Sequence, residues 1–466
     1  MTIKRLPCRS LIFHFALPLV FLNPAARAVE TTPGNETQAQ AAAIAAHAWS
    51  IVPNILAHIT PPTFPDRTFV ITNYGAKGDG VADCTEAFRK AIDACSQAGG
   101  GKVVVPAGVY LTGAIHLKSN VDLDVAKGAT IRFSTDPKSY LPVVFTRYEG
   151  IEVMNYSPFI YALGQQNIAI TGEGTLDGQA SDAVWYSWKR MSDPEALAAM
   201  VNQGVPVAQR IFGEGHHLRP NFIQPVCCKN LLIEGVTITN SPMWVLNPVF
   251  CTNVTVKGVT VDTQGPNTDG CDPDSCTDVL IKHCNFSDGD DCIAIKSGRD
   301  VDGRHVNIPS RSIVIQNCVF KDGHGGVTVG SETSGGVEDV FAENCHFDSP
   351  NLDIAMRLKT GMTRGGFIKH IYIRDCTVKF ARTGIGINMR YPGTLDGHST
   401  PIIQNIDIRN CTFDRLTKQP IIIEGFSDSV RVTDVTIANC VFPDTGIQSI
   451  ITNASRVNFI GTHGLD

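Results

Sequence analysis

The stretch Asp278-Val-Leu-Ile-Lys-His-Cys284 decides the fold, because variants of it return along most of the chain. Each copy alternates apolar and polar residues, is rich in β-branched side chains and ends in a polar turn, a pattern typical of a β-strand. Clear copies begin at Asn253, Ser312, Asp339, His370, Asn405 and Asp434, and weaker ones at Asn167 and Asn230. The chain is therefore built largely from one repeated strand-and-turn unit.

The spacing of the copies indicates a solenoid. Their first apolar positions are Leu231, Val254, Val279, Ile313, Val340, Ile371, Ile406 and Val435, which gives steps of 23, 25, 34, 27, 31, 35 and 29 residues. A short minimal step with insertions in the others fits one coil per copy plus loops of variable length. The chain has neither the consensus of leucine-rich repeats nor the long 3.6-residue periodicity of helical repeats. The sequence therefore predicts an all-β fold, a parallel β-helix.

The ends of the repeat region suggest how the 466-residue chain is organised. Residues 66–466 are predicted to form a single β-helix domain with a long insertion at about 179–222, and insertions of this kind form the walls of clefts. Residues 83–98 are predicted to form an amphipathic helix that caps the open end of the solenoid. The Ala- and Pro-rich residues 29–65 are expected to be a loosely ordered lead-in.

Residues 1–28 have the pattern of a secretory signal peptide. A basic start precedes an apolar run from Leu11 to Leu22, and Ala26-Arg27-Ala28 supplies small residues at a cleavage site. The run is shorter than the ~20 residues that a membrane span needs. We therefore expect a secreted or periplasmic protein that has no membrane association after signal cleavage.

The charge balance bears on possible partners. Removing the four basic residues of 1–28 from the 39 of the whole chain leaves 35 Lys and Arg against 45 Asp and Glu, a net charge near −10. Such a balance argues against nucleic acid as a partner. It does not exclude an anionic polysaccharide, because a local basic patch in a cleft decides that binding. The sequence implies no metal and no organic cofactor, and it leaves the oligomeric state open.

Many of the cysteines follow the repeat. Cys284, Cys318, Cys345, Cys376, Cys411 and Cys440 share one position of the repeated unit. Although secreted chains often form disulfides, we predict that this column consists of buried free thiols stacked coil over coil. For Cys271, Cys276 and Cys292 the sequence leaves pairing open.

Four polar segments stand where the repeat would be apolar. They are Asn267-Thr-Asp269, Gly289-Asp290-Asp291, Gly323-His324-Gly325 and Arg357-Leu-Lys359. The steps from Asp269 to Asp291, His324 and Arg357 are 22, 33 and 33 residues, or about one coil each. Taken singly, each segment has an ordinary interpretation, such as a solvated turn, a calcium loop with Asp272 and Asp274, or an exposed face. Their joint occurrence at coil spacing favours one stacked site.

The residue types in this patch suit glycosidic hydrolysis. That reaction needs one carboxyl group to protonate the leaving oxygen and another to activate water or to attack directly. Asp269, Asp290 and Asp291 can supply both, because closely packed carboxylates repel one another and retain a proton. Arg357 and Lys359 alternate along a predicted strand, so they point the same way and can hold a sugar carboxylate.

Together the four segments resemble glycoside hydrolase family 28, the polygalacturonase family, over roughly residues 68–455. The resemblance implies a right-handed parallel β-helix that cleaves α-1,4-galacturonosidic bonds of polygalacturonate or pectin with inversion. At the matching positions it implies Asp290 as general acid, Asp269 and Asp291 as the pair that activates water, and His324 beside the acid. It also implies that Arg357 and Lys359 bind the galacturonate carboxylate, that Asn267 orients the first aspartate or the substrate, and that Tyr391 contacts substrate.

The mode of action is less sharply defined by the sequence. The segments around His324, Gly330-Ser-Glu332 and Arg364-Gly-Gly366 are most similar to the bacterial exo-acting branch, so exo action is expected and endo action is the close alternative. Hydrolysis of rhamnogalacturonan or xylogalacturonan stays open, because fold and acid residues do not define the flanking sugar. A pectate lyase would need a calcium-binding acidic cluster and a basic residue for elimination. A non-catalytic polysaccharide-binding β-helix would not need stacked aspartates.

Overall fold

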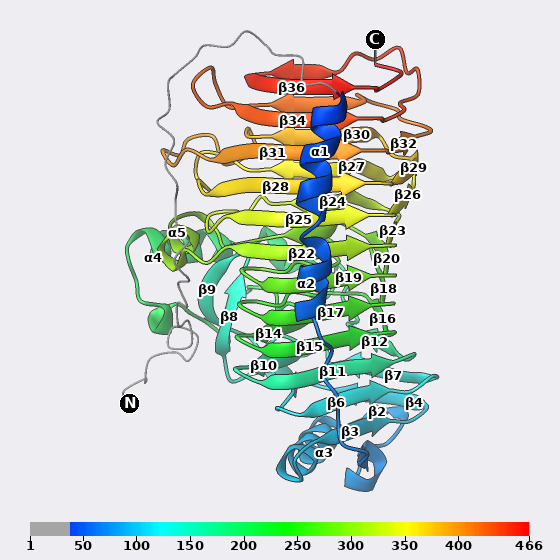
Figure 1. Cartoon of the computed structure of the whole chain (residues 1–466). Coiled ribbons are helices and arrows are strands. Elements are labelled where there is room, and N and C mark those ends of the chain that lie inside the picture. Colours follow the sequence, from blue (N-terminus) through cyan, green and yellow to red (C-terminus); the bar gives the residue numbers. More distant parts are fainter. Residues whose placement is uncertain (1–37, 466) are drawn as a thin grey trace, which may run out of the picture.

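Successive coils stack along one axis in the computed structural model, and three parallel sheets run along the stack (Figure 1). The structure describes residues 38–465, so the predicted signal peptide at 1–28 lies outside the described residues. The predicted all-β parallel β-helix is confirmed. None of the described helices is long and apolar enough to cross a membrane.

The first sheet contains the repeated unit. Its 13 strands are β1 (Thr68–Val70), β3 (Gly101–Val105), β6 (Val121–Val125), β11 (Gln166–Gly172), β15 (Lys229–Glu234), β17 (Thr252–Lys257), β19 (Thr277–Lys282), β22 (Ser310–Gln316), β25 (Val337–Glu343), β28 (Phe367–Arg374), β31 (Ile402–Arg409), β34 (Val432–Ala438) and β36 (Ala454–Ile460). The register pairs the predicted first apolar positions with one another, from Leu231 with Val254 to Ile406 with Val435. Each copy of the repeat is thus one coil.

Two further faces complete each coil. The second sheet has 11 strands, namely β2 (Asp79–Asp83), β4 (Gly108–Thr112), β7 (Ala129–Phe133), β12 (Thr175–Asp177), β16 (Thr237–Thr239), β18 (Thr260–Thr263), β20 (Asn285–Asp288), β23 (Val319–Phe320), β26 (His346–Asp348), β29 (Thr377–Phe380) and β32 (Thr412–Phe413). The third face comprises β5 (Ile115–His116), β10 (Ile160–Leu163), β14 (Ile223–Val226), β21 (Asp291–Ile295), β24 (Gly323–Val329), β27 (Leu352–Lys359), β30 (Thr383–Asn388), β33 (Ile421–Glu424) and β35 (Ile450–Thr452). Single-residue bridges at Leu246 and Cys271 join β14 to β21, so this face is continuous.

The polar residues at the two ends of each repeat make the bends. Asn253 and Asp278, which begin two copies, have φ angles of 58° and 57°, and Asn344, which ends another, has a φ of 54°. Asn and Asp tolerate this left-handed conformation better than other residues with a side chain. A bend at each end of a short strand lets three strands close one coil.

The interior is filled by stacked apolar columns. The aromatic rings of Phe286, Phe320 and Phe347 stack coil over coil with centroid separations of 5.8 and 4.7 Å. The cysteine column from Cys284 to Cys440 consists of buried free thiols, as predicted, and Cys271, Cys276 and Cys292 are free as well. The column therefore contributes to the core as small apolar side chains do.

The predicted capping helix is present as α3 (Thr85–Gln97). It buries Phe88, Ala91 and Ile92 against the first coils. The Asp83 carboxylate accepts a hydrogen bond from the Thr85 backbone N–H at 2.9 Å, which satisfies one free donor at the helix start.

The prediction of a loosely ordered lead-in is wrong for the described part of 29–65. Helices α1 (Gln38–Trp49) and α2 (Val52–His58) lie along the outer side of the first sheet (Figure 1). The rings of Trp49 and Phe341 meet edge-on with their centroids 5.3 Å apart, and the Arg374 guanidinium lies 3.7 Å from the centroid of the Trp49 ring. This side of the sheet is unusually apolar, with Leu280, Val314 and Phe341 in one cluster with the helices. We call residues 38–63 the N-terminal strap.

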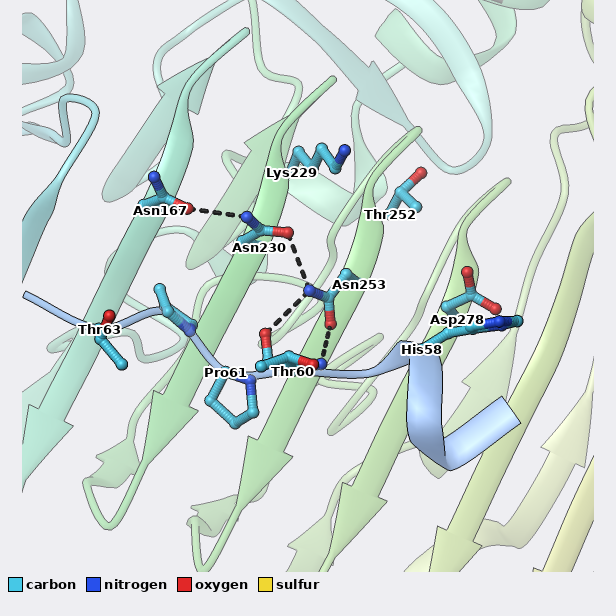
Figure 2. A pocket seen from close by; sticks show the side chains of 11 residues that line it. His58, Thr60, Pro61, Thr63, Asn167, Lys229, Asn230, Thr252, Asn253 and Asp278 are labelled. Atoms are coloured by element: carbon cyan, nitrogen blue, oxygen red, sulfur yellow. Dashed lines mark hydrogen bonds between the residues drawn. The ribbon is translucent and has the colours of Figure 1, made fainter. Parts of the chain in front are cut away.

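The strap ends in an extended segment that crosses a ladder of asparagines (Figure 2). Asn253 donates to Asn230, and Asn230 donates to Asn167, each at 2.8 Å. Asn253 also exchanges two hydrogen bonds of 3.0 and 2.9 Å with the Thr60 backbone. A cavity of about 540 Å³ lies here, lined mostly by amide, hydroxyl and proline side chains. It belongs to the seam between strap and sheet, and the four predicted site segments line another face.

Two insertions project beside the coils that precede the predicted site. Hairpin β8 (Val144–Tyr148) and β9 (Ile151–Asn155) belongs to the first, which sequence analysis did not separate from the regular coils. The second contains α4 (Asp193–Asn202) and β13 (Ile211–Phe212), and β13 pairs with β9. We call β8 and β9 the wall hairpin. Helix α5 (Asp300–Val306) lies next to it (Figure 1).

Candidate active site

The third face brings the four predicted segments together. Asp269 lies just before the Cys271 bridge, Asp290 directly precedes β21 and Asp291 begins it, and His324 lies on β24. Strand β24 pairs with both β21 and β27, and β27 carries Arg357 and Lys359. One carboxylate oxygen from each of the three aspartates lies within 4.8 Å of the others. The arrangement is a cluster of carboxylates bordered by basic side chains.

Asp291 is fully buried and held by two cations. Its Oδ1 accepts from Arg357 at 3.1 Å and its Oδ2 from Lys359 at 2.5 Å. A Cβ atom at position 325 would lie 2.6 Å from Oδ1 of Asp291, closer than real Cβ contacts allow. Gly325 therefore gives the carboxylate room to meet Arg357.

Asp290 faces the solvent side of the cluster, with its side chain 17% exposed. Its Oδ1 lies 2.9 Å from Nδ1 of His324. Burial alone would raise the pKa of Asp290, but the hydrogen bond with His324 and the charge of Lys359 hold that pKa below its usual value. The same hydrogen bond raises the pKa of His324, so each group favours the charged form of the other.

Asp269 is the carboxylate that is hardest to ionise. Burial, and then the charges of Asp290 and Asp291, raise its pKa to about 8, against the opposing effect of Lys296 and Lys359. In the ligand-free protein the cluster therefore keeps one proton at neutral pH. Such a proton belongs to the coupled group as a whole rather than to one fixed residue.

The two remaining predicted residues lie at the edge of the cluster. The Asn267 side-chain amide donates to Oδ2 of Asp290 at 3.5 Å, and its carbonyl oxygen accepts from Arg219 at 2.8 Å. The Lys359 ammonium lies 5.1 Å from the centroid of the Tyr391 ring. Asn267 is thus next to the predicted acid, and Tyr391 is next to the predicted carboxylate-binding cations.

Sequence reasoning missed the buried charges behind the cluster. Lys296 contacts Asp269, Asp272 and Glu332, and Arg219 holds Asn267. A signal for Lys296 exists, because this lysine directly follows the all-buried strand β21. Glu332 stands out in the sequence only because its segment, Gly330-Ser-Glu332, is similar to one branch of the family. For Arg219 no spacing signal exists, since it comes from an insertion outside the repeat.

The wall hairpin lies across the third face in the coils that precede the aspartates. Tyr161 on β10 donates its hydroxyl to the Phe145 carbonyl at 2.6 Å. Gln224 on β14 donates to the Arg147 carbonyl at 2.9 Å and to the Asn247 side chain at 2.7 Å. The face is therefore covered up to the aspartates on one side, while Arg357 and Tyr391 continue it on the other.

Two buried ion pairs fix the wall hairpin and its neighbours. Arg147 meets Asp274 at 2.6 Å, with both side chains fully buried. Arg210 meets Asp302 of α5 at 2.5 Å, and Asp302 also accepts from the Glu152 backbone N–H. Loss of one partner from such a pair would leave an unpaired charge buried, which strongly destabilises a protein. The two ion pairs therefore hold the hairpin and its neighbours in place over the face.

A parallel β-helix that places three carboxylates and two cations together on a face covered by a hairpin on one side has the features of a polysaccharide-cleaving glycosidase. Residues 95–457 match the model of glycosyl hydrolases family 28. The chain belongs to this family and is a glycoside hydrolase, as the resemblance implied.

Several characterised proteins are similar to this chain. An exopolygalacturonase from Thermotoga maritima has a structure that superposes with a TM-score of 0.84 at 40% identity, covering 89% of this chain and 96% of that one. The exo-poly-alpha-D-galacturonosidase of Dickeya chrysanthemi is 27% identical over 84% of this chain and 69% of its own length. An endo-polygalacturonase of Pectobacterium carotovorum is 28% identical over 76% of this chain and 83% of its own.

Proposed function

We propose that this protein hydrolyses the α-1,4-galacturonosidic bonds of polygalacturonate from one chain end by an inverting single displacement. The observation that carries the proposal is the carboxylate cluster of Asp269, Asp290 and Asp291, which retains a proton and lies against Arg357 and Lys359. Hydrolysis needs a proton for the leaving oxygen and a base for water, and this cluster contains both functions.

Asp290 is the proposed general acid, as the family resemblance implies. It is the most exposed of the three carboxyl groups and faces His324. Before substrate binds, the retained proton lies mainly on Asp269. The mechanism therefore includes the transfer of that proton to Asp290. A bound uronate would shield the charge of Lys359 and exclude water around Asp290, and both effects raise the pKa of Asp290. Asp269 then becomes the ionised partner.

Asp269 and Asp291 are the proposed pair that activates water. Two acceptors that share one water at about 2.8 Å each lie roughly 4.5 Å apart, which agrees with the separation of up to 4.8 Å within the cluster. The ~6.5–9.5 Å typical of inverting enzymes separates the general acid from the base, whereas one oxygen of Asp290 lies within 4.8 Å of one oxygen of Asp269 and of Asp291. Inversion therefore rests on the family resemblance and on the shared-water geometry, and product stereochemistry must test it.

A uronate is the proposed sugar at the cleavage point. Arg357 uses one guanidinium nitrogen for Asp291, and its other N–H groups are suited to a second carboxylate. Lys359 and Tyr391 lie beside it. The names of the similar proteins, all galacturonan-cleaving, support galacturonate as that uronate.

Exo action is the proposed mode, and endo action is its alternative. The wall hairpin covers the third face on one side of the aspartates, so a long chain can extend from them only on the other side. The 40% identity to an exopolygalacturonase over 89% of this chain also supports exo action.

Export from the cytoplasm is the proposed fate of the chain. It is supported by the basic start, apolar run and small-residue cleavage pattern of residues 1–28. Amino-terminal sequencing of the exported protein should begin at Val29.

The test follows the products released from polygalacturonate. We expect reducing ends to rise without the ultraviolet absorbance of unsaturated uronates, with mono- or digalacturonate appearing from the outset. Asp290→Asn should lose about 10²–10⁴-fold in kcat, whereas Asp262→Asn, at an exposed position on β18, should keep full activity. Rising absorbance would show elimination, early long oligomers would show endo action, and retained anomeric configuration in the first product would refute inversion.

A further inference from the structure

Lys296 is a buried cation that directly contacts the proposed water-activating pair. Its side chain is 3% exposed, and its ammonium lies 3.4 Å from Oδ2 of Asp269 and 3.0 Å from Oε2 of Glu332. It also donates to the Gly330 carbonyl at 3.2 Å and lies 3.8 Å from Asp272. A lysine buried to this extent is not placed to bind substrate itself, so its charge acts through these partners.

We propose that Lys296 is a positioning residue that holds Asp269 in its ionised form, and that Glu332 regulates this effect by sharing the same ammonium. The proposal rests on the proposed function, in which Asp269 helps to activate water.

The charges around Asp269 explain why a dedicated cation is needed. Asp290 and Asp291 repel its negative charge, and only Lys296 and Lys359 oppose them among its main interactions. Lys359 is already bound to Asp291 at 2.5 Å. Lys296 is therefore the cation that contacts Asp269 directly.

The surroundings of Lys296 keep it protonated. Burial would lower its pKa, but Glu332, Asp272 and Asp269 raise that pKa well above its usual value. The face of the Trp244 ring, 4.6 Å from the ammonium, completes its shell. Lys296 thus carries a fixed positive charge throughout the pH range in which the carboxylate cluster titrates.

Glu332 competes with Asp269 for this ammonium. It is itself held by Arg364 at 3.4 Å, and the charges of Lys296, Arg364 and Arg299 keep its pKa below the usual value despite burial. Removing its charge leaves Lys296 with fewer anionic partners. The ammonium then acts more strongly on Asp269. Neutralising Lys296 and neutralising Glu332 should therefore shift the ionisation of Asp269 in opposite directions.

The experiment measures kcat and KM on polygalacturonate across pH for Lys296→Met, Lys296→Arg and Glu332→Gln. Loss of the cation makes every proton of the cluster harder to release, so both limbs of the kcat profile should move to higher pH in Lys296→Met, by about one to three pH units. Its kcat should fall while KM stays near the wild-type value. Lys296→Arg keeps the charge and should keep the wild-type limbs.

Glu332→Gln is the decisive second variant, because Lys296→Met removes a cation that three buried carboxylates share and is at risk of misfolding. The kcat profile of Glu332→Gln should move to lower pH. A profile that stays in place or moves upward in Glu332→Gln overturns the proposal, and so does an unmoved profile in a folded Lys296→Met. Failure of the proposed function looks different, because the wild-type protein would then release no saturated reducing ends at all.

Discussion

Replacing Arg147 by Met should detach the wall hairpin from the β-helix. The guanidinium lies 2.6 Å from Asp274, with both side chains 0% exposed, and it also contacts Ser275 at 3.0 Å. Burial already raises the pKa of Asp274, against the effect of Arg147. The variant leaves that carboxylate buried without its cation, which typically costs about 3–5 kcal/mol. We expect a loss of that size in the free energy of unfolding at pH 8.

Urea denaturation with a refolding arm measures this loss and tests reversibility. Lowering the pH should reduce the deficit, because the unpaired carboxylate can then take up a proton. Arg147→Met combined with Asp274→Asn should recover most of the stability, since Asn keeps an acceptor for the Gly298 N–H, which bonds to Asp274 at 2.9 Å. A single variant that loses less than about 1 kcal/mol, or a double variant as unstable as the single one, would refute the reasoning.

Two further predictions concern His324 and the N-terminal strap. The pKa of His324 is raised by Asp290, so its contribution to stability is present below about pH 6.5 and is lost as the pH rises through the raised pKa. The stability deficit of His324→Asn in urea should therefore be larger at pH 5.5 than at pH 9, and an equal deficit at both would contradict this pairing. Trp49→Ala should remove about 3 kcal/mol and speed proteolysis within the strap, since Trp49 is buried against Phe341. Ile44→Ala, at a position 58% exposed on the same helix, should do neither.

The repeat makes most of the fold predictable. A coil has a fixed geometry, so the spacing of Leu231, Val254 and the later apolar positions matches the register of the first sheet residue by residue. The same regularity assigns Asp269, Asp291 and His324 to one face of the solenoid from their spacing alone. The burial of the thiols follows as well, because a cysteine at the same position of successive coils points into the solenoid core.

The features that lie outside the repeat could not be predicted in this way. Strand β8 is rich in β-branched and aromatic residues, as the coil strands are, and only its antiparallel pairing with β9 sets it apart, which is a contact rather than a pattern. The sequence predicts a loosely ordered lead-in where the strap forms two helices, because a segment rich in Ala and Pro has the composition of a linker. Its helical state depends on the apolar outer side of the first sheet, around Val314 and Phe341.

The wall and the catalytic cluster are connected through Arg219. This side chain comes from the second insertion, donates to the carbonyl oxygens of Pro242 and Pro266, and holds Asn267 against Asp290. Strand β13 of the same insertion pairs with β9 of the wall hairpin, so the second insertion contacts both the hairpin and the residue beside the proposed acid. Removing that insertion would unpair β9 and release Asn267, so a change from the proposed exo action to endo action by this deletion would be accompanied by a lower kcat. A shortened wall that keeps Arg219 in place would separate the two effects.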